Sequence, residues 1–158
     1  MKFKLLIAFC LPLAAACAEK PDEAPVPAVE VEAAQQPVAL PRSAAAEDAR
    51  VFFISPADGD TVNNPIRVVF GTEGMTVVPA GNDVPHSGHH HLLIDTELPE
   101  LGLPIPKDEH HVHFGDGSTE TEITLEPGEH TLQLLLGDHL HIPHDPPLIS
   151  ARITITVK

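Results

Sequence analysis

The sequence predicts an all-β fold, an immunoglobulin-like antiparallel β-sandwich that follows a signal peptide and a disordered linker. Short apolar runs alternate with polar residues at a period of two, turn sequences rich in Gly, Pro and Asp separate these runs, and no stretch carries a convincing helical repeat. Short strands joined by turns favour two packed sheets. The chain has no Trp and no Tyr, and its only two Cys precede residue 18, so neither the core disulfide nor the tyrosine corner of a true immunoglobulin domain is expected.

Residues 1–16 form the predicted signal peptide. Lys2 and Lys4 precede the apolar stretch "LLIAFCLPLAAA". This stretch is shorter than the roughly 20 residues that a membrane-spanning helix needs. Cys17 follows directly, and this junction resembles a bacterial lipobox, in which the signal is cut before a cysteine that then carries lipid. The resemblance implies a protein anchored by Cys17 in the periplasm or at the outer membrane. Cleavage after "ACA" would instead give a soluble periplasmic or secreted protein.

Residues 17–49 are predicted to be an acidic linker rich in Pro and Ala. They show no apolar periodicity, so they cannot bury a core. This composition suits a tether between the lipid anchor and a domain at residues 50–158. Because a segment without buried apolar area adds little stability, a chain that begins near Ala49 is expected to melt at nearly the same temperature as a longer one.

The strands of the domain are predicted from the alternation of apolar and polar residues. In chain order they occupy residues 65–70, 92–94, 119–125, 130–136 and 151–158. Their inward-facing residues are Ile66, Val68 and Phe70, then Thr121, Ile123 and Leu125, then Leu132, Leu134 and Leu136, and finally Ala151, Ile153, Ile155 and Val157. Turn sequences at residues 56–60, 115–118 and 126–129 separate these runs.

The histidines are concentrated in one part of this domain, because all 11 fall between His86 and His144. The stretch "GHHHLLID" is internal, which excludes a terminal tag. Residues i and i+2 of an extended strand project on the same face, about 6.5 to 7 Å apart, so a His-x-His pair presents two imidazoles to one side. His90 would then point to the opposite face from its two neighbours. The three His-x-His pairs are His89 with His91, His111 with His113, and His139 with His141.

Convergence of these pairs predicts one or two closely spaced sites for zinc or copper(II). Imidazole is a neutral ligand that suits both metals, and after the signal only Met75 remains as a sulfur ligand once Cys17 is acylated. Residues that could orient the rings are Asp95, Asp116, Asp138, His144 and Asp145. Two alternatives stay open, a hydrogen-bond network of histidines and carboxylates without metal, and surface chelation without biological meaning. The isolated His86 and His130 are expected to be ordinary solvated or hydrogen-bonded residues.

Other functions fit the composition less well. The formal net charge of −14 becomes −16 when Lys2 and Lys4 leave with the signal, which excludes a nucleic-acid partner. Ser87 lacks the glycine of a nucleophile elbow and no "HExxH" motif occurs, so a non-enzymatic role is favoured. The second hypothesis is an interaction or structural module of the envelope with a pH-responsive histidine surface, whose protein partner the sequence does not specify. The third hypothesis is a zinc-dependent hydrolase with Asp95 or Asp138 as base.

Four motifs carry a family resemblance: "SPADGDTV", "GHHHLLID", "HFGDGSTE" and "PGEHTLQLLLGDHLHIPHDPP", followed by a final strand. In this order they are similar to a bacterial family of domains of unknown function, DUF4399. The resemblance covers about Val51 to Val157 and implies one small exported domain behind a lipoprotein or secretory signal. It implies no activity, so the metal hypothesis rests on the spacing of the histidines.

Overall fold

The computed structural model describes residues 38–158. The predicted signal peptide, Cys17 and the linker up to residue 37 lie outside the described residues. Within residues 38–158 every regular element is a strand, and none of these residues forms a helix long and apolar enough to cross a membrane. The strands are β1 (Arg50–Ser55), β2 (Thr61–Val62), β3 (Ile66–Glu73), β4 (Thr76–Val77), β5 (Ser87–Ile94), β6 (His111–His113), β7 (Glu120–Ile123), β8 (Gly128–Gly137) and β9 (Ile153–Val157).

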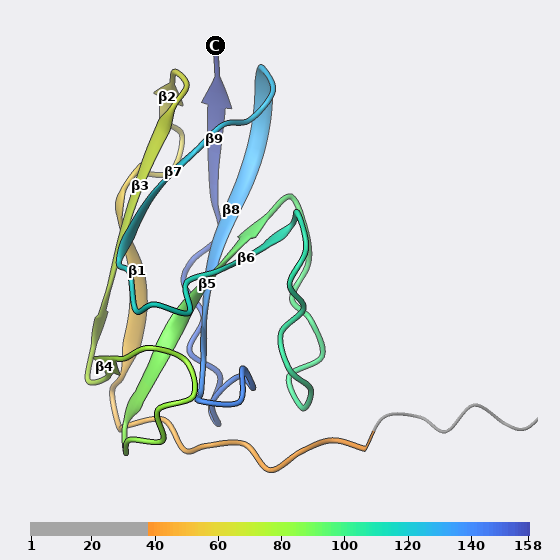
Figure 1. Ribbon diagram of the computed structural model, residues 1–158. Coiled ribbons are helices and arrows are strands. Elements are labelled where there is room, and N and C mark those ends of the chain that lie inside the picture. The colour runs from red at the N-terminus through yellow and green to blue at the C-terminus, as the bar shows by residue number, and fades with distance from the viewer. Residues whose placement is uncertain (1–37) are drawn as a thin grey trace, which may run out of the picture. The chain divides into compact units, whose positions relative to one another are not determined.

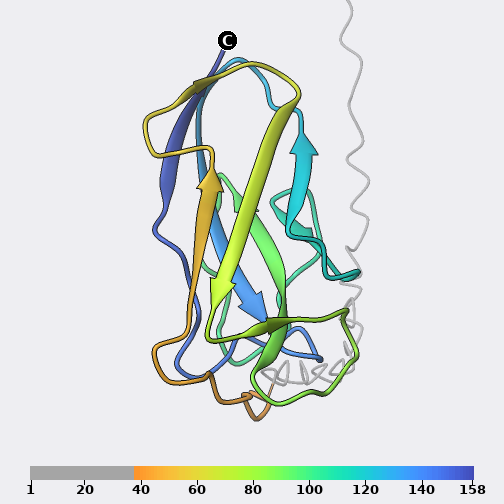
Figure 2. The same ribbon diagram turned by 90° about the vertical axis from the view of Figure 1, so that its left-hand side faces the viewer.

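These strands form two sheets, which confirms the predicted all-β fold. The smaller sheet has the order β1-β3-β7, and the larger has the order β2-β9-β8-β5-β4 with β6 also paired to β5. In Figure 1 β1, β3 and β7 form a layer to the left of β8 and β9, and in Figure 2, which is seen from that side, this layer lies in front of β5 and β8. The finer assignment to an immunoglobulin-like sandwich stays a prediction.

The purely antiparallel pairing that the sequence predicted is wrong in two places, because β2 runs parallel to β9 and β4 runs parallel to β5. A tight hairpin would have made β4 and β5 antiparallel. The chain instead travels back through residues 78–86 before β5 begins, so both strands point the same way. The larger sheet is therefore mixed.

The main core lies between the two sheets and contains most of the residues that alternation predicted to face inward. Ala151 is an exception: it is exposed, because β9 begins only at Ile153. Ile66, Val68 and Phe70 of β3 are buried against the larger sheet, and Phe70 packs on Phe114 with ring centroids 4.9 Å apart. The larger sheet contributes Leu132, Leu134, Leu136, Ile153, Ile155 and Val157. Period two thus identified the core faces of β3, β8 and β9 correctly.

Strand β5 differs from the others because all eight of its residues are buried. Leu92 and Ile94 face the main core. Leu93 faces the other way and packs with Ile105 and Leu135 in a second, smaller cluster. The connections between β5 and β6 and between β8 and β9 supply the cover on this outer face, so side chains on both faces of β5 are removed from water.

The end of the predicted linker packs on the domain. The Leu40 N–H donates to the carbonyl of Gly102 at 2.9 Å, and the Ala45 N–H donates to that of Asp145 at 3.0 Å. The Arg42 guanidinium donates to the carbonyls of Pro143 and His144 and pairs with the Asp145 carboxylate. The packed part of the chain therefore begins near Leu40 rather than at residue 50. Hydropathy did not indicate this, because main-chain hydrogen bonds and one arginine hold the segment.

Deletion of this segment should destabilise the domain, contrary to the expectation from composition. A chain that begins at Arg50 loses the contacts of Arg42 and the main-chain bonds of Leu40 and Ala45. We expect it to melt more than about 5 °C below a chain that begins at residue 38, which corresponds to roughly 1 kcal/mol for a domain of this size. Thermal denaturation followed by circular dichroism measures the difference, and equal melting temperatures would show that the segment contributes nothing.

Candidate metal centre

Four histidines gather on the outer face of the larger sheet. His89 and His91 project from β5, His113 from β6, and His141 from the turn that follows β8. The ring centroid of His89 lies 4.8 Å from that of His91, 5.0 Å from that of His113 and 4.9 Å from that of His141. We call these four residues the histidine cluster.

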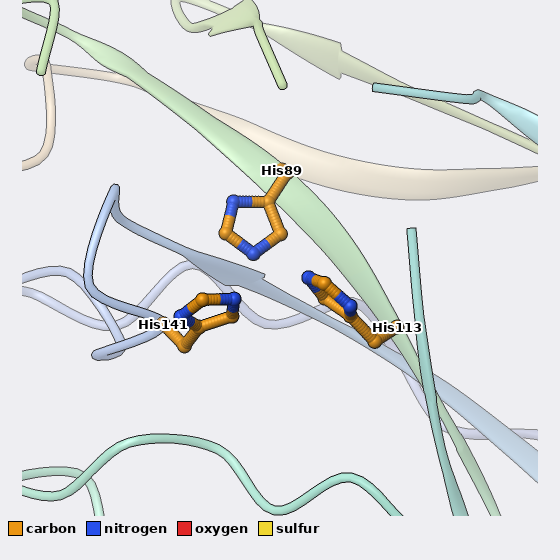
Figure 3. Close-up of side chains that lie close together, drawn as sticks. All are labelled: His89, His113 and His141. Atoms are coloured by element: carbon orange, nitrogen blue, oxygen red, sulfur yellow. The ribbon is translucent and has the colours of Figure 1, made fainter. Parts of the chain in front are cut away.

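Three rings of the cluster surround a common point. One ligand nitrogen each from His89, His113 and His141 lies within 4.8 Å of the other two. In Figure 3 each of these rings turns a nitrogen toward the space between them. His91 lies beside them, with its ring centroid 5.1 Å from that of His113 and 6.0 Å from that of His141.

The turn that presents His141 is fixed by Asp138. One carboxylate oxygen of Asp138 accepts the backbone N–H groups of Leu140 and Ile142, at 2.9 and 3.0 Å. His141 has a φ of 67°, a left-handed conformation that few residues other than glycine adopt. Its carbonyl accepts the N–H of Ile105 at 2.8 Å, so the turn is held from both sides.

Asp138 is buried and keeps its charge. Burial alone would raise the pKa of this carboxyl, but the Ser43 hydroxyl and the N–H groups of Ile142 and Leu140 outweigh it and hold the pKa below its ordinary value. The Ser43 hydroxyl donates to the second carboxylate oxygen at 2.7 Å. Every hydrogen bond of Asp138 thus serves the turn or the N-terminal segment.

Two glycines let the backbone come close to the rings. Gly137 stands opposite His89 in the pairing of β8 with β5, and a Cβ at this position would lie 2.8 Å from Cε1 of His91. A Cβ at Gly115 would collide with Cε1 of His113. Any larger residue at either position would displace a ring of the cluster.

Five ring nitrogens of the cluster are buried without hydrogen-bond partners among the described residues. Both nitrogens of His89, both of His91 and Nε2 of His113 are buried, and no atom of residues 38–158 pairs with them. His89 and His91 are 0% and 1% exposed. An unpaired buried polar atom costs about 1–3 kcal/mol, so a group that pairs with these nitrogens would stabilise the cluster.

The same burial keeps the rings neutral. Burial, followed by the neighbouring rings of His141 and His113, lowers the pKa of His89 to about 4. Burial and the other rings lower the pKa of His91 to about 2, and burial lowers that of His113. At neutral pH these imidazoles therefore have free lone pairs, which is the form that binds metal ions.

A cleft of about 360 Å³ gives access to the cluster. Three of the histidines line it, together with Pro104, Ile105, Pro106 and Lys107 of the connection between β5 and β6. His113 and His141 are half-buried, whereas His89 lies beneath them. The cluster is thus closed toward the sheet and open toward the cleft.

His90 lies on the opposite face of β5, as period two required. Its ring packs edge-on against Phe70 with centroids 4.6 Å apart, inside the main core. Neither of its nitrogens has a partner among the described residues, and burial lowers its pKa to about 4. His90 therefore takes no part in the cluster.

His111 and His139, which the sequence grouped with the other four, point elsewhere. In the antiparallel register His113 stands opposite His91, and His111 stands opposite Leu93. His111 is therefore farther along the strand from His89, and its Nδ1 lies 2.8 Å from Asp108. His139 precedes His141 in a turn rather than a strand, where i and i+2 need not share a face, and its Nδ1 lies 3.6 Å from an Asp83 oxygen.

The residues expected to orient the rings have other partners. Asp95 bonds Nδ1 of His130 at 2.6 Å, the Asp116 carboxylate accepts from Ser118, and Asp145 pairs with Arg42. His144 directs Nε2 to the carbonyl of Ser87 at 3.0 Å. Asp138 acts on the cluster through the turn of His141, and the charge of Asp116 partly offsets the lowering of the His113 pKa. His130 is hydrogen-bonded, as expected for an isolated histidine.

Sequence reasoning missed Gly115, Gly137 and Lys107. Each of these residues reads as an ordinary turn or loop residue, and nothing in a single sequence shows that a ring lies over a glycine. The one available signal was the "GDH" at residues 137–139, which predicted a turn stabilised by Asp138 but not which histidine it would present.

The fold and the cluster define a small all-β domain with buried histidines on the outer face of its larger sheet. The family model described as "Domain of unknown function (DUF4399)" matches residues 68–158, more than half of the chain, and the chain belongs to this family. The matched range contains all four histidines of the cluster. No curated protein and no solved structure matches the chain significantly.

Acid should unfold the metal-free protein through its buried histidines. An imidazole in an unfolded chain titrates near 6.5, whereas the pKa values of His89 and His90 in the folded protein are about 4. The unfolded chain therefore binds more protons between these values, and stability that is complete above pH 6.5 is lost as the pH falls toward 4. We expect each of these two residues to lower the free energy of unfolding by roughly 2 kcal/mol between pH 7 and pH 5, measured by denaturant titration after chelator treatment.

His90→Leu is the matched variant for this measurement. Leucine fills the position beside Phe70 without a group that titrates, so the loss of stability between the same two pH values should shrink by about the contribution of one histidine. A variant whose stability falls as steeply as that of the unsubstituted protein would contradict this account of His90.

Proposed function

We propose that this protein is an exported metal-binding protein of the bacterial cell envelope that holds zinc or copper(II) through His89, His113 and His141. The observation that supports it most directly is the convergence of three ring nitrogens, among which those of His89 and Nε2 of His113 are buried without hydrogen-bond partners in residues 38–158. A metal ion would bind one lone pair of each of these rings and so stabilise the cluster.

The spacing of the three rings fits such an ion after a small adjustment. Nitrogens bound to zinc at about 2.0–2.1 Å in a tetrahedron lie about 3.3 Å from one another. The three nitrogens now lie within 4.8 Å, so the rings would close by at most about 1.5 Å. His113 and His141 are half-buried beside the cleft, which leaves them room to move.

The donor set determines the class of metal. It contains neither thiolate nor carboxylate, and three imidazoles suit zinc and copper(II). Copper(II) binds nitrogen ligands more tightly than zinc does, whereas a tetrahedral arrangement of the ligands favours zinc. We assign His91 as a neighbour of the bound ion rather than a fourth ligand, because its ring stands farther from His141 than the other two rings do.

A binding role fits the surroundings better than hydrolysis. The two carboxylates that could have served as a base are engaged, Asp95 with His130 and Asp138 with the turn of His141. The cleft itself is lined by no Asp or Glu. A hydrolase would need a base within hydrogen-bond reach of the attacking water.

The location is the second half of the proposal. The lipobox-like junction at Cys17 supports attachment to the periplasmic side of the envelope through a lipid. A metal site made only of imidazoles suits such an oxidising compartment, because it has no thiolate to lose to disulfide formation.

Two histidines of the same turn give a matched test of metal binding. His141→Asn removes a proposed ligand, and asparagine tolerates the left-handed φ at this position, whereas His139→Asn changes a residue outside the cluster. We expect His141→Asn to weaken zinc or copper(II) binding by about 100-fold or more, since the ion loses one of three ligands, and His139→Asn to bind like the unsubstituted protein. Isothermal titration calorimetry measures both.

Thermal denaturation gives an independent reading of the same proposal. Metal at 100 times its Kd should stabilise the unsubstituted protein and His139→Asn by about 2.7 kcal/mol, and His141→Asn much less. If metal leaves all three melting temperatures unchanged, or both variants bind equally, the cluster is no metal site. The pH-responsive interaction module would then be the better account.

Anchoring is tested separately from metal binding. Cys17→Ser removes the proposed lipid-bearing residue, and one lipid-bearing residue would be the whole anchor. We expect the variant to move from the membrane fraction to the soluble periplasmic fraction after cell fractionation and immunoblotting. Continued membrane association would mean that another part of the chain holds it there.

A further inference from the structure

We infer that the cleft beside the histidine cluster is a binding site for a small inorganic anion, which would sit on the bound metal ion between His91 and Lys107. This inference rests on the proposed metal site and names the ligand class of its open position. The argument uses the lining of the cleft, the one cation in it and the unpartnered ring of His91.

The size and the lining of the cleft suit a small anion. Its volume of about 360 Å³ lies at the low end of the range of roughly 300–1,000 Å³ for small-molecule sites. No carboxylate lines it, although the chain as a whole has a formal charge of −14. The lining residues are His91, Pro104, Ile105, Pro106, Lys107, His113 and His141.

Lys107 is a cation without a carboxylate partner. Residues 38–158 contain six Lys and Arg, and the four arginines all form ion pairs, with Asp145, Glu73, Glu120 and Glu97. Lys107 forms none within this part of the chain, and its charge reaches the cluster, where it helps to lower the pKa of His113. A free ammonium group at the mouth of the cleft is available to an anion.

His91 provides a directed donor at the inner end of the cleft. Its ring is 1% exposed, and neither of its nitrogens has a partner among the described residues. A neutral imidazole carries one N–H donor and one acceptor. With its ring outside the converging set of three, His91 can donate this N–H to a group bound on the metal.

The positive charge of the proposed metal-loaded site also favours an anion. Three neutral imidazoles do not reduce the charge of a divalent ion, so the loaded site would carry two positive charges in a partly buried position. Sites with three protein ligands keep a position for an exogenous group. An anion in that position would neutralise part of the charge and contact both Lys107 and His91.

Azide added to the copper(II)-loaded full-length protein tests this inference, because azide bound to copper(II) produces a new absorption band. The metal content of each sample is measured first, so that failure to bind copper is separated from failure to bind azide. At constant ionic strength we expect a saturable azide band. Lys107→Ala should raise the Kd for azide about fivefold, and Lys107→Arg should restore most of the affinity.

Lys158→Ala is the matched control, since Lys158 is also without a carboxylate partner among residues 38–158 but lies at the end of β9, outside the cleft lining. The copper content of His91→Leu is measured as well, and at equal copper loading this variant should bind azide more weakly, because leucine has no N–H donor. Fully loaded protein without a saturable azide band would overturn the inference and leave the metal site standing. An equal Kd for Lys107→Ala and Lys158→Ala would remove Lys107 from it. Protein that takes up no copper would overturn both proposals.

Discussion

The burial of β5 on both faces is the constraint on which the rest of this structure depends. It buries the rings of His89 and His91, and none of residues 38–158 forms a hydrogen bond with their nitrogens. Close packing around the rings then requires Gly137 beneath His91 and Gly115 beneath His113. The buried histidines and the two glycines together form a site for four imidazole rings. Each of these features alone would destabilise the sheet or the turn.

Two observations bear on the alternatives to a metal site that the sequence left open. A network of histidines and carboxylates would have given the rings hydrogen-bond partners, but the carboxylates nearby are engaged with His130, Ser118 and Arg42. Adventitious chelation on a surface would have left the rings in water, but His89 is fully buried. The proposed metal ion is consistent with both observations.

The sequence predicted well which residues of a strand share a face, but it did not predict how the strands pair with one another. Alternation placed Val68 and Leu134 in the core and His89 beside His91, because the period of a strand is a local property. Pairing register is a long-range property, and a shift of two residues decided that His113 rather than His111 stands beside His91. His141 depended on a turn conformation, and no periodicity describes a turn.

The N-terminal segment shows how the tether and the site are joined physically. Composition assigned residues 38–49 to a passive linker, yet the Ser43 hydroxyl bonds the carboxylate of Asp138. The other oxygen of the same carboxylate fixes the N–H groups that shape the turn of His141. Ser43 thus stabilises the charged form that the turn requires. One ring of the cluster is consequently positioned from outside the two sheets, by the part of the chain that leads toward the proposed anchor.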